Sequence, residues 1–366
     1  MKKIIKYLIF FALVSCFGAN VQAQAGKDGP LTIGSANAVV NHYARVIGDV
    51  TTGDLFVTVL NVSSFDQLEY GDLVMVIQMQ GASITNTTGK GWGALSSLNQ
   101  AGRYEFAYVQ WVDKYQNRVY FCSGLSNDYT ASGRVQLVQV PQYTDLTITG
   151  AGSVTAPSWD GITGGVVAIH ATGTVTVNGS VSAAGKGFRG GVRDNLTSVS
   201  GAGIVTVTAS SSQSDGAEKG ESIAGFYKEY DAVGGRYGRG APANGGGGGN
   251  GHNAGGGGGA NAGSLASWNG YGVMNTSVTG YTAYQLDPGY IWNGNAYTTS
   301  SGGGRGGYTY ASTNSDALTL PPGSAGWGGD YRDTVGGYGG RPPFWYFLFV
   351  RLFLGGGGGG GGGKKT

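Results

Sequence analysis

The chain has 366 residues, of which 73 are glycine and only 12% are charged, and its formal net charge is +2. So much glycine excludes one large apolar core running through the whole chain. A net charge this close to zero also argues against a protein that binds nucleic acids over a broad basic surface.

The first residues are typical of a secretory signal peptide. Three lysines precede a short apolar run at 7–14, and a small-residue cleavage site ends at Ala23. We therefore expect residues 1–23 to be removed and the exported chain to begin at Gln24; loss of the three lysines changes the net charge from +2 to −1. The apolar run is too short to span a bilayer. Residues 13–16 read LVSC and leave an alternative, a lipoprotein whose N-terminus is a lipidated Cys16.

Residues 24–141 are predicted to form a small β-domain, a sandwich or barrel without a convincing helix. In 55–60 both faces are apolar, which favours a buried strand, whereas the strand at 73–80 becomes polar on one face at Gln78 and Gln80. Turn residues at 113–117 predict a hairpin. The remaining strands are predicted at 104–111, 118–122, which contains Cys122 as a small buried residue, and 135–140.

Residues 142–209 are predicted to form short β-solenoid-like rungs. The sequence LTITGAGSVTA at 146–156 recurs as VTVNGSVSA at 175–183, and a further strand is expected between them at 165–171. A period near 28 built from small and β-branched residues suits stacked rungs. The alternative for Asn178 and Gly179 is the turn of a plain hairpin.

Residues 210–343 are predicted to form a glycine-rich module. Twelve of the twenty residues at 244–263 are glycine, in two runs of five. Only chains without side chains can pack closely enough to bond backbone to backbone, so we expect polyproline-II-like strands that display the aromatic-bearing inserts as loops. The alternative is a flexible linker.

Residues 344–366 break with this composition. An apolar strip, FWYFLFVRLFL, is followed by nine glycines and KKT. Arg351 interrupts the strip, which is also too short to span a membrane. We expect this end to be anomalous and the natural C-terminus to be truncated; the alternative is a tail that inserts into a partner or a lipid surface.

Two stretches support a family resemblance: GDLVMVIQMQG at 71–81, and 164–191 from GGVVAI to GKGFRGG. Over about residues 30–260 the chain resembles glycine-rich secreted or surface proteins of gliding and related bacteria, some described as adventurous-gliding-motility proteins. The resemblance implies export and a surface role but no catalytic residues. The glycine runs are also similar in composition to the extracellular glycine-rich region of anaplastic lymphoma kinase receptors, where polyproline-II strands pack together.

Aromatic residues in the first insert of the module are the candidate ligand contacts, because amphipathic rings stack on sugars or dock a partner at low entropic cost. The candidates are Trp268, Tyr271, Tyr290 and Trp292. The alternative is that these rings only cover the glycine module.

No cofactor, catalytic constellation or metal centre is expected. The three histidines, at 42, 170 and 252, lack ligand spacing. Asp330 and Asp333 leave two interpretations open, a shared calcium ion or a solvated turn. Thr334, in Asp-Thr-Val, matches a short bacterial O-glycosylation pattern.

The sequence as a whole predicts an all-β secreted or cell-surface protein with a structural or adhesive function. The expected partners are cell-surface glycans, a substratum or other surface proteins, with an outer membrane as a compatible location; nucleic acid is not expected. One alternative is a polysaccharide-degrading β-solenoid enzyme, which needs a cluster of charged residues on one rung face. Another is a disordered glycine-rich component of the cell wall.

Overall fold

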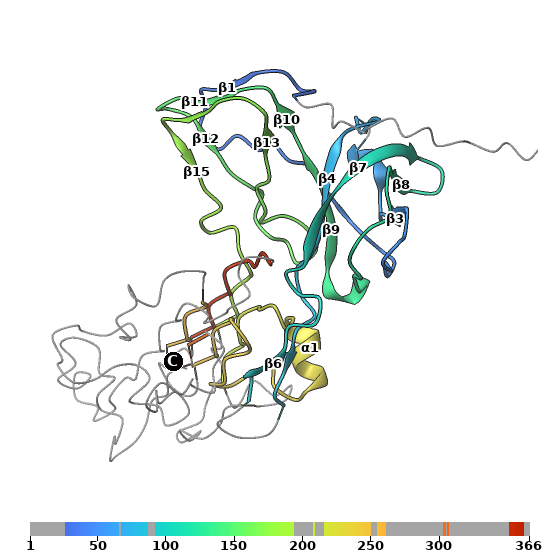
Figure 1. The fold of residues 1–366 in the computed structure, drawn as a ribbon. Coiled ribbons are helices and arrows are strands. Elements are labelled where there is room, and N and C mark those ends of the chain that lie inside the picture. Colours follow the sequence, from blue (N-terminus) through green and yellow to red (C-terminus); the bar gives the residue numbers. More distant parts are fainter. Residues whose placement is uncertain are drawn as a thin grey trace, which may run out of the picture.

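The computed structural model describes residues 26–65, 67–86, 92–193, 208, 216–249, 255–260, 303–304, 306 and 351–361. The described part is nearly all-β, as predicted, with a β-barrel, a stack of rungs and a glycine-rich bundle (Figure 1). Its one α-helix is α1 (Tyr227–Ala232), and no helix within these residues is long and apolar enough to cross a bilayer.

The barrel is a curled antiparallel sheet of six strands in the order β2-β9-β4-β7-β8-β3. Its edges meet where the Ile47 amide donates to the Thr58 carbonyl (3.0 Å) and the Leu60 amide donates to Arg45 (2.8 Å). The strands are β2 (Tyr43–Arg45), β3 (Phe56–Thr58), β4 (Leu73–Gln78), β7 (Tyr104–Asp113), β8 (Arg118–Phe121) and β9 (Val135–Val140). Two 3-10 turns, Val62–Phe65 and Ala131–Gly133, and the small hairpin β5 (Ser83–Ile84) with β6 (Leu95–Ser97) complete this part.

Side chains that alternate inward fill the barrel. Val57, Val109, Val119 and Leu137 are 0–1% exposed in this core. The strand at 55–60 differs from expectation, because Leu55 and Leu60 are 53% and 59% exposed and only one face is buried. Both leucines flank β3 at the barrel surface, where they are largely open to solvent.

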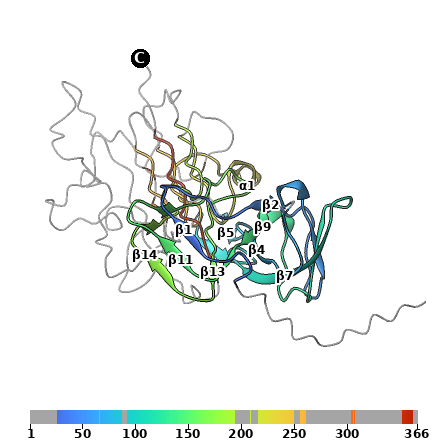
Figure 2. The same ribbon diagram turned by 90° about the horizontal axis from the view of Figure 1, so that it is seen from above.

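The rungs form parallel ladders beside the barrel (Figure 2). β11 (Leu146–Ile148) pairs with β14 (Val175–Val177), β10 (Gln142–Tyr143) with β13 (His170–Ala171), and β12 (Ser153–Val154) with β15 (Ser180–Val181). This is the register of the sequence repeat. A hairpin at Asn178 and Gly179 is therefore wrong, since the strands on either side of them pair with the preceding rung instead.

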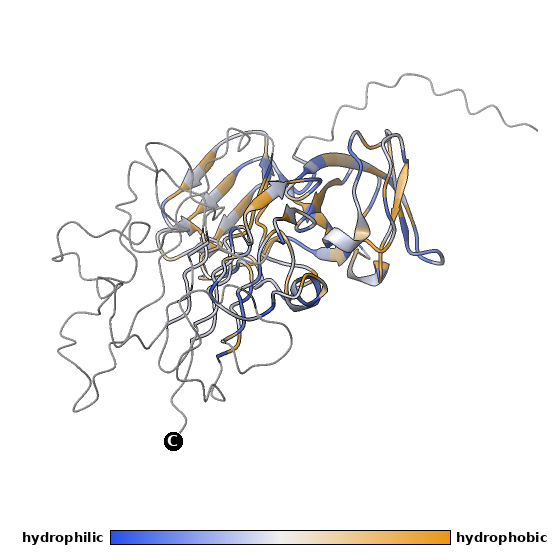
Figure 3. Cartoon of the chain, turned by 90° about the horizontal axis from the view of Figure 1, so that it is seen from below, coloured by the Kyte–Doolittle hydropathy of each residue, from blue (hydrophilic) through white to orange (hydrophobic). Residues whose placement is uncertain are grey.

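One further strand belongs to the rungs although it lies before the barrel in the sequence. β1 (Leu31–Ile33) pairs in parallel with β11, Leu31 opposite Leu146, and Ala38 bridges to Val154. The barrel is thus inserted between the first rung and the second. Hydrophobic residues, orange in Figure 3, gather in the strands of both parts. The rungs cover one side of the barrel, where the Tyr43 hydroxyl donates to the Val166 carbonyl (2.5 Å).

Five segments, the last three made almost entirely of glycine, form what we call the glycine bundle: residues 188–192, 217–222, 244–249, 255–260 and 355–360. Its backbone hydrogen bonds recur every third residue. The Gly246 and Gly249 amides donate to Gly357 and Gly360 (2.8 Å each), and the Gly356 and Gly359 amides donate to Ala260 and Gly257 (2.8 Å each). A three-residue period with bonds only to neighbouring chains is the mark of polyproline-II packing.

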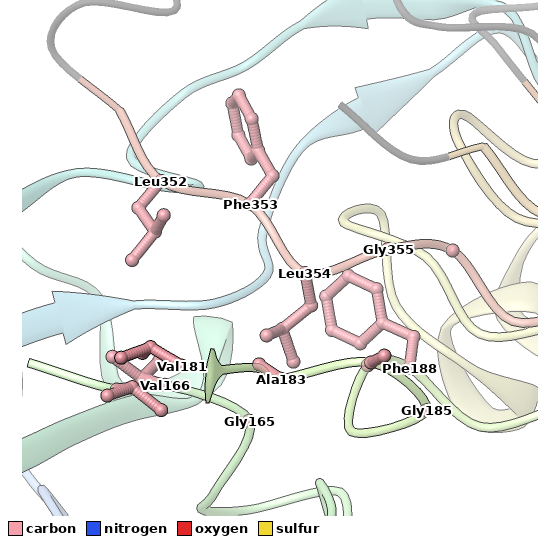
Figure 4. Close-up of a pocket in the computed structure, with 14 residues that line it drawn as sticks. Gly165, Val166, Val181, Ala183, Gly185, Phe188, Leu352, Phe353, Leu354 and Gly355 are labelled. Carbon is pink, nitrogen blue, oxygen red and sulfur yellow. The ribbon is translucent and has the colours of Figure 1, made fainter. Parts of the chain in front are cut away.

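The end of the described chain lies within this bundle, which the composition did not predict. Residues 355–360 form backbone hydrogen bonds with all four other segments and run among them in Figure 1. Ahead of them Leu354 is 7% exposed and points between Ala183 and Phe188 (Figure 4). Leu354 fills the junction of rungs and barrel, and the glycines that follow it supply backbone partners to the bundle.

Buried polar side chains connect the bundle to the barrel. Glu221 is fully buried, and its carboxylate accepts hydrogen bonds from the Arg189 guanidinium (2.8 Å) and from the Gln80 side chain (2.9 Å). Gln78 and Gln80, which make one strand face polar, are thus buried rather than solvated: Gln78 accepts the Thr130 amide (2.8 Å) and donates to the Gln80 carbonyl (2.7 Å).

Candidate ligand-contact surface

The ligand-contact candidates from the sequence, Trp268, Tyr271, Tyr290 and Trp292, all lie outside the described residues. The same holds for Cys16, for the calcium candidates Asp330 and Asp333, and for Thr334. The structure therefore places none of them. Another group of aromatic side chains, within the barrel, is well defined.

A bulge in β7 creates this group. Ala107 and Val109 point into the core, and the register shifts between Val109 and Trp111. The extra residue turns Trp111 to the outer face, where it is 47% exposed. Bulges of this kind re-aim a side chain without ending the strand.

Three rings then lie side by side across β7, β8 and β3, and we call Trp111, Tyr120 and Phe56 the aromatic row. Trp111 stacks on Tyr120 with ring centroids 4.3 Å apart and planes 8° from parallel. Tyr120 meets Phe56 at 5.1 Å, tilted by 39°. The strand register sets these neighbours, because Tyr120 is opposite both Trp111 and Phe56.

Arg118 adds a cation at the end of the row. Its guanidinium carbon lies 4.5 Å from the centroid of the Phe56 ring, a cation–π distance. The Arg118 Nε is buried and has no hydrogen-bond partner among the described residues. The row is thus an aromatic surface with a guanidinium at one end.

The chemistry available here is contact rather than reaction. Flat, half-exposed rings bind the apolar faces of sugars or the side chains of a protein, and a guanidinium donates to hydroxyl or carboxylate oxygens. Part of the signal is in the sequence: aromatic residues at 104, 106 and 108 alternate along one predicted strand face. Position 111 breaks that alternation, so a regular strand would have buried Trp111.

A second hollow lies between the last rung and residues 352–356 and has a volume of about 630 Å³. Figure 4 shows Val166, Val181, Phe188 and Leu354 around it. All its lining residues are apolar or glycine, among the residues that the structure describes. The hollow can hold an apolar group but offers no acid, base or nucleophile.

Two aspartates of the rungs are engaged in turns. Asp145 accepts the Thr174 amide (2.7 Å), and Asp160 accepts the amides of Ile162 and Thr163 (2.7 and 2.8 Å). These carboxylates organise the backbone. No group of three or more metal-ligating side chains occurs within the described ranges.

Two residues considered from sequence are placed by the structure. Cys122 is half-buried, its thiol donates to the Val109 carbonyl, and burial raises its pKa, which keeps it protonated and unreactive. His170 lies in β13, and its Nδ1 is buried without a partner among the described residues.

No protein-family model and no curated protein matches the chain. Among solved structures it is similar to three phage tailspikes. The first is gp49 from Pseudomonas phage LKA1, with 13% identity over 36% of this chain and 27% of that chain and a TM-score of 0.20. The second is Gp54 of Acinetobacter baumannii bacteriophage AP22 in complex with A. baumannii capsular saccharide, with 12% identity over 42% of this chain and 26% of that chain and a TM-score of 0.22. The third is gp61 of Pseudomonas phage phi297, with 12% identity over 43% of this chain and 24% of that chain and a TM-score of 0.20. The chain spans about a quarter of the length of each. At these TM-scores the likeness establishes neither a shared fold nor a function.

Proposed function

We propose that the protein is a secreted or cell-surface structural protein that adheres to glycans through the aromatic row. The observation that carries this proposal is the exposed row itself: Trp111 is 47% exposed and stacked on Tyr120, with the Arg118 guanidinium beside Phe56. Export through a signal peptide at residues 1–23, and a surface role like that of the gliding-bacterial proteins, are part of the same proposal.

The rest of the fold serves as a support. The rungs cover the opposite part of the barrel's outer face, where Leu73, Met75 and Ile77 are buried, and leave the aromatic row free. Because the glycine bundle is bonded to the barrel through Glu221 and Gln80, a load on the row would reach the bundle through buried contacts. An adhesive protein needs such a rigid path.

A glycan array with the full chain and a Trp111→Ala variant tests the proposal. Loss of one stacked ring is worth roughly 0.5–1.5 kcal/mol, so we expect binding to weaken by up to about tenfold. Tyr115→Ala is the matched control, because Tyr115 is 99% exposed at the hairpin tip, outside the row. Equal binding by both variants, or the absence of any bound glycan, contradicts the proposal.

The same glycans also separate adhesion from degradation. A polysaccharide-degrading enzyme would release shortened products on prolonged incubation, whereas an adhesive protein returns the polymer intact. Release of oligosaccharides that continues in Trp111→Ala would replace our proposal by an enzymatic one.

A further inference from the structure

A separate pocket lies where all three parts of the molecule meet. It has a volume of about 290 Å³ and is lined by Arg45 and Arg134 of the barrel, the turn at 160–162 between rungs, Arg189 of the glycine bundle, and residues 226–229 around α1. We call it the arginine pocket. Four of its lining side chains are cationic, Lys228 being the fourth, and two are acidic, Asp160 and Glu229.

The acids of this pocket are already engaged. Glu229 accepts from Arg134 (3.1 Å) and from the Phe226 amide (3.0 Å), and the carboxylate of Asp160 accepts two amides of its own turn. Behind the pocket, Glu221 pairs with Arg189 (2.8 Å). Each carboxylate therefore has its partner before any ligand enters.

Two cations are left over. Arg45 and Lys228 have no side-chain hydrogen bond or ion pair within the described residues, and the buried Nε of Arg45 lacks any partner there. A buried N–H without a partner costs about 1–3 kcal/mol, which a ligand oxygen would recover. The pocket thus contains two cationic donors that an anionic ligand could pair with.

The size of the pocket and the residues of its wall limit which ligands it can hold. A volume near 290 Å³ lies at the small end of the range for ligand sites and suits one sugar ring rather than a chain. The Phe226 ring holds the Arg189 guanidinium at 4.7 Å, and the Tyr227 ring holds the Arg236 guanidinium at 5.0 Å, so both rings of this wall carry a cation. The planar fork of arginine matches two oxygens of an anion such as a carboxylate.

We propose that the arginine pocket binds a hexuronic acid unit of a glycan, its carboxylate on Arg45 and Lys228. This rests on the proposed function, since it names the chemistry of one sugar that the adhesive protein selects. The aromatic row would contact neutral sugar faces of the same polymer, and the pocket would bind the carboxylate of its hexuronic acid unit.

Calorimetric titration of the full chain with D-glucuronate tests the proposal, with D-glucose and the methyl ester of glucuronic acid as neutral comparisons and sulfate as a simple anion. We expect glucuronate alone to bind well, with an affinity that falls as salt rises. Arg45→Gln should weaken binding tenfold or more. Arg45→Lys, which keeps the charge but loses the fork, should fall between it and the unmodified protein.

Arg103→Gln is the charge-matched control, because Arg103 lies on another groove of the surface. Lys228→Gln serves as a second variant in case the Arg45 variants fail to fold, because Lys228 is exposed and its replacement should not disturb the fold. We expect it to bind glucuronate about threefold more weakly. Equal binding of the methyl ester, tighter binding of sulfate than of glucuronate, or unchanged affinity in Arg45→Gln and Lys228→Gln would each overturn the proposal. Neutral glycan binding that depends on Trp111 without any glucuronate binding would overturn this inference alone and leave the proposed function standing.

Discussion

The barrel and the glycine bundle are ordered by opposite means. The barrel buries side chains: Val57, Val109, Val119 and Leu137 are almost fully removed from solvent. The bundle buries backbone, and its segments bond to one another through amides and carbonyls at every third residue. Barrel stability therefore comes mainly from the hydrophobic effect, whereas the bundle depends on close approach of chains that have no Cβ.

This difference shows that the two regions fail under opposite substitutions. Removal of side-chain atoms should damage the barrel, and addition of a single methyl should damage the bundle. The wide conformational freedom of glycine in the unfolded chain makes bundle order costly, so the hydrogen bonds leave little surplus.

The largest effect is expected from Gly359→Ala. A Cβ at Gly359 would collide with the carbonyl oxygen of Gly247, and backbone at the centre of the bundle has no room to move. We expect a loss of about 3 kcal/mol or more, enough to open the bundle to proteases. Limited proteolysis followed by mass spectrometry of the fragments measures it, and unchanged cleavage would show that the glycine segments act as linkers.

A comparable loss is expected in the barrel from the reverse change, Leu137→Ala. Leu137 is fully buried, so deletion of its side chain leaves a cavity that costs about 2–5 kcal/mol. Denaturant unfolding measures the loss, with Leu55→Ala as the control. Leu55 is 53% exposed, so its loss should stay within about 0.5 kcal/mol. If both variants lose the same stability, the barrel core is not packed as described.

Alkaline pH should act on both regions through buried tyrosines. Burial and the neighbouring Glu105 raise the pKa of Tyr129 in the barrel, and burial raises the pKa of Tyr230, whose hydroxyl donates to the Gly220 carbonyl in the bundle. A raised pKa stabilises the fold below the unfolded value, about 10, and this contribution falls as pH rises above it. Each tyrosine accounts for about 1.4 kcal/mol per pH unit in that range.

Unfolding free energies from pH 8 to 11 test this expectation. Tyr129→Phe and Tyr230→Phe should each flatten the alkaline decline by about one proton. A decline as steep as that of the unmodified chain in both variants would mean that lysines or other groups cause it.

Elements with local side-chain signals could be predicted from sequence. The hairpin of β7 and β8 follows from Asp113, whose carboxylate accepts the amides of Tyr115 and Gln116, and from Asn117, which adopts φ 53°. The rung register follows from the repeat, because β-branched residues recur at positions that stack. The repeat does not reveal the first rung, although Leu31-Thr-Ile33 matches Leu146-Thr-Ile148, since the inserted barrel separates the two copies by over a hundred residues.

The pairing of glycine segments has no such signal. Runs of identical residues without side chains can pair with one another in any register, so composition predicts a bundle but not its neighbours. Composition alone therefore does not place residues 355–360 in the bundle that they enter. Of the ligand-contact surface, the aromatic strand could be read from sequence, but the bulge that exposes Trp111 could not.

The smallest expected effect, and the sharpest test of the bundle, is Gly358→Ala. Gly358 lies beside Gly359, yet the nearest atom to a Cβ there is the Gly257 carbonyl oxygen at 3.5 Å, an ordinary contact, and its φ lies outside the left-handed region. Alanine fits this backbone and restricts the unfolded chain. We therefore expect the free energy of unfolding of the bundle, measured from its thermal transition, to rise by about 0.4–1 kcal/mol. Opposite signs at neighbouring positions can arise only if each glycine faces a fixed neighbour, as polyproline-II packing requires. If Gly358→Ala destabilises the bundle as much as Gly359→Ala, the segments are packed in another register.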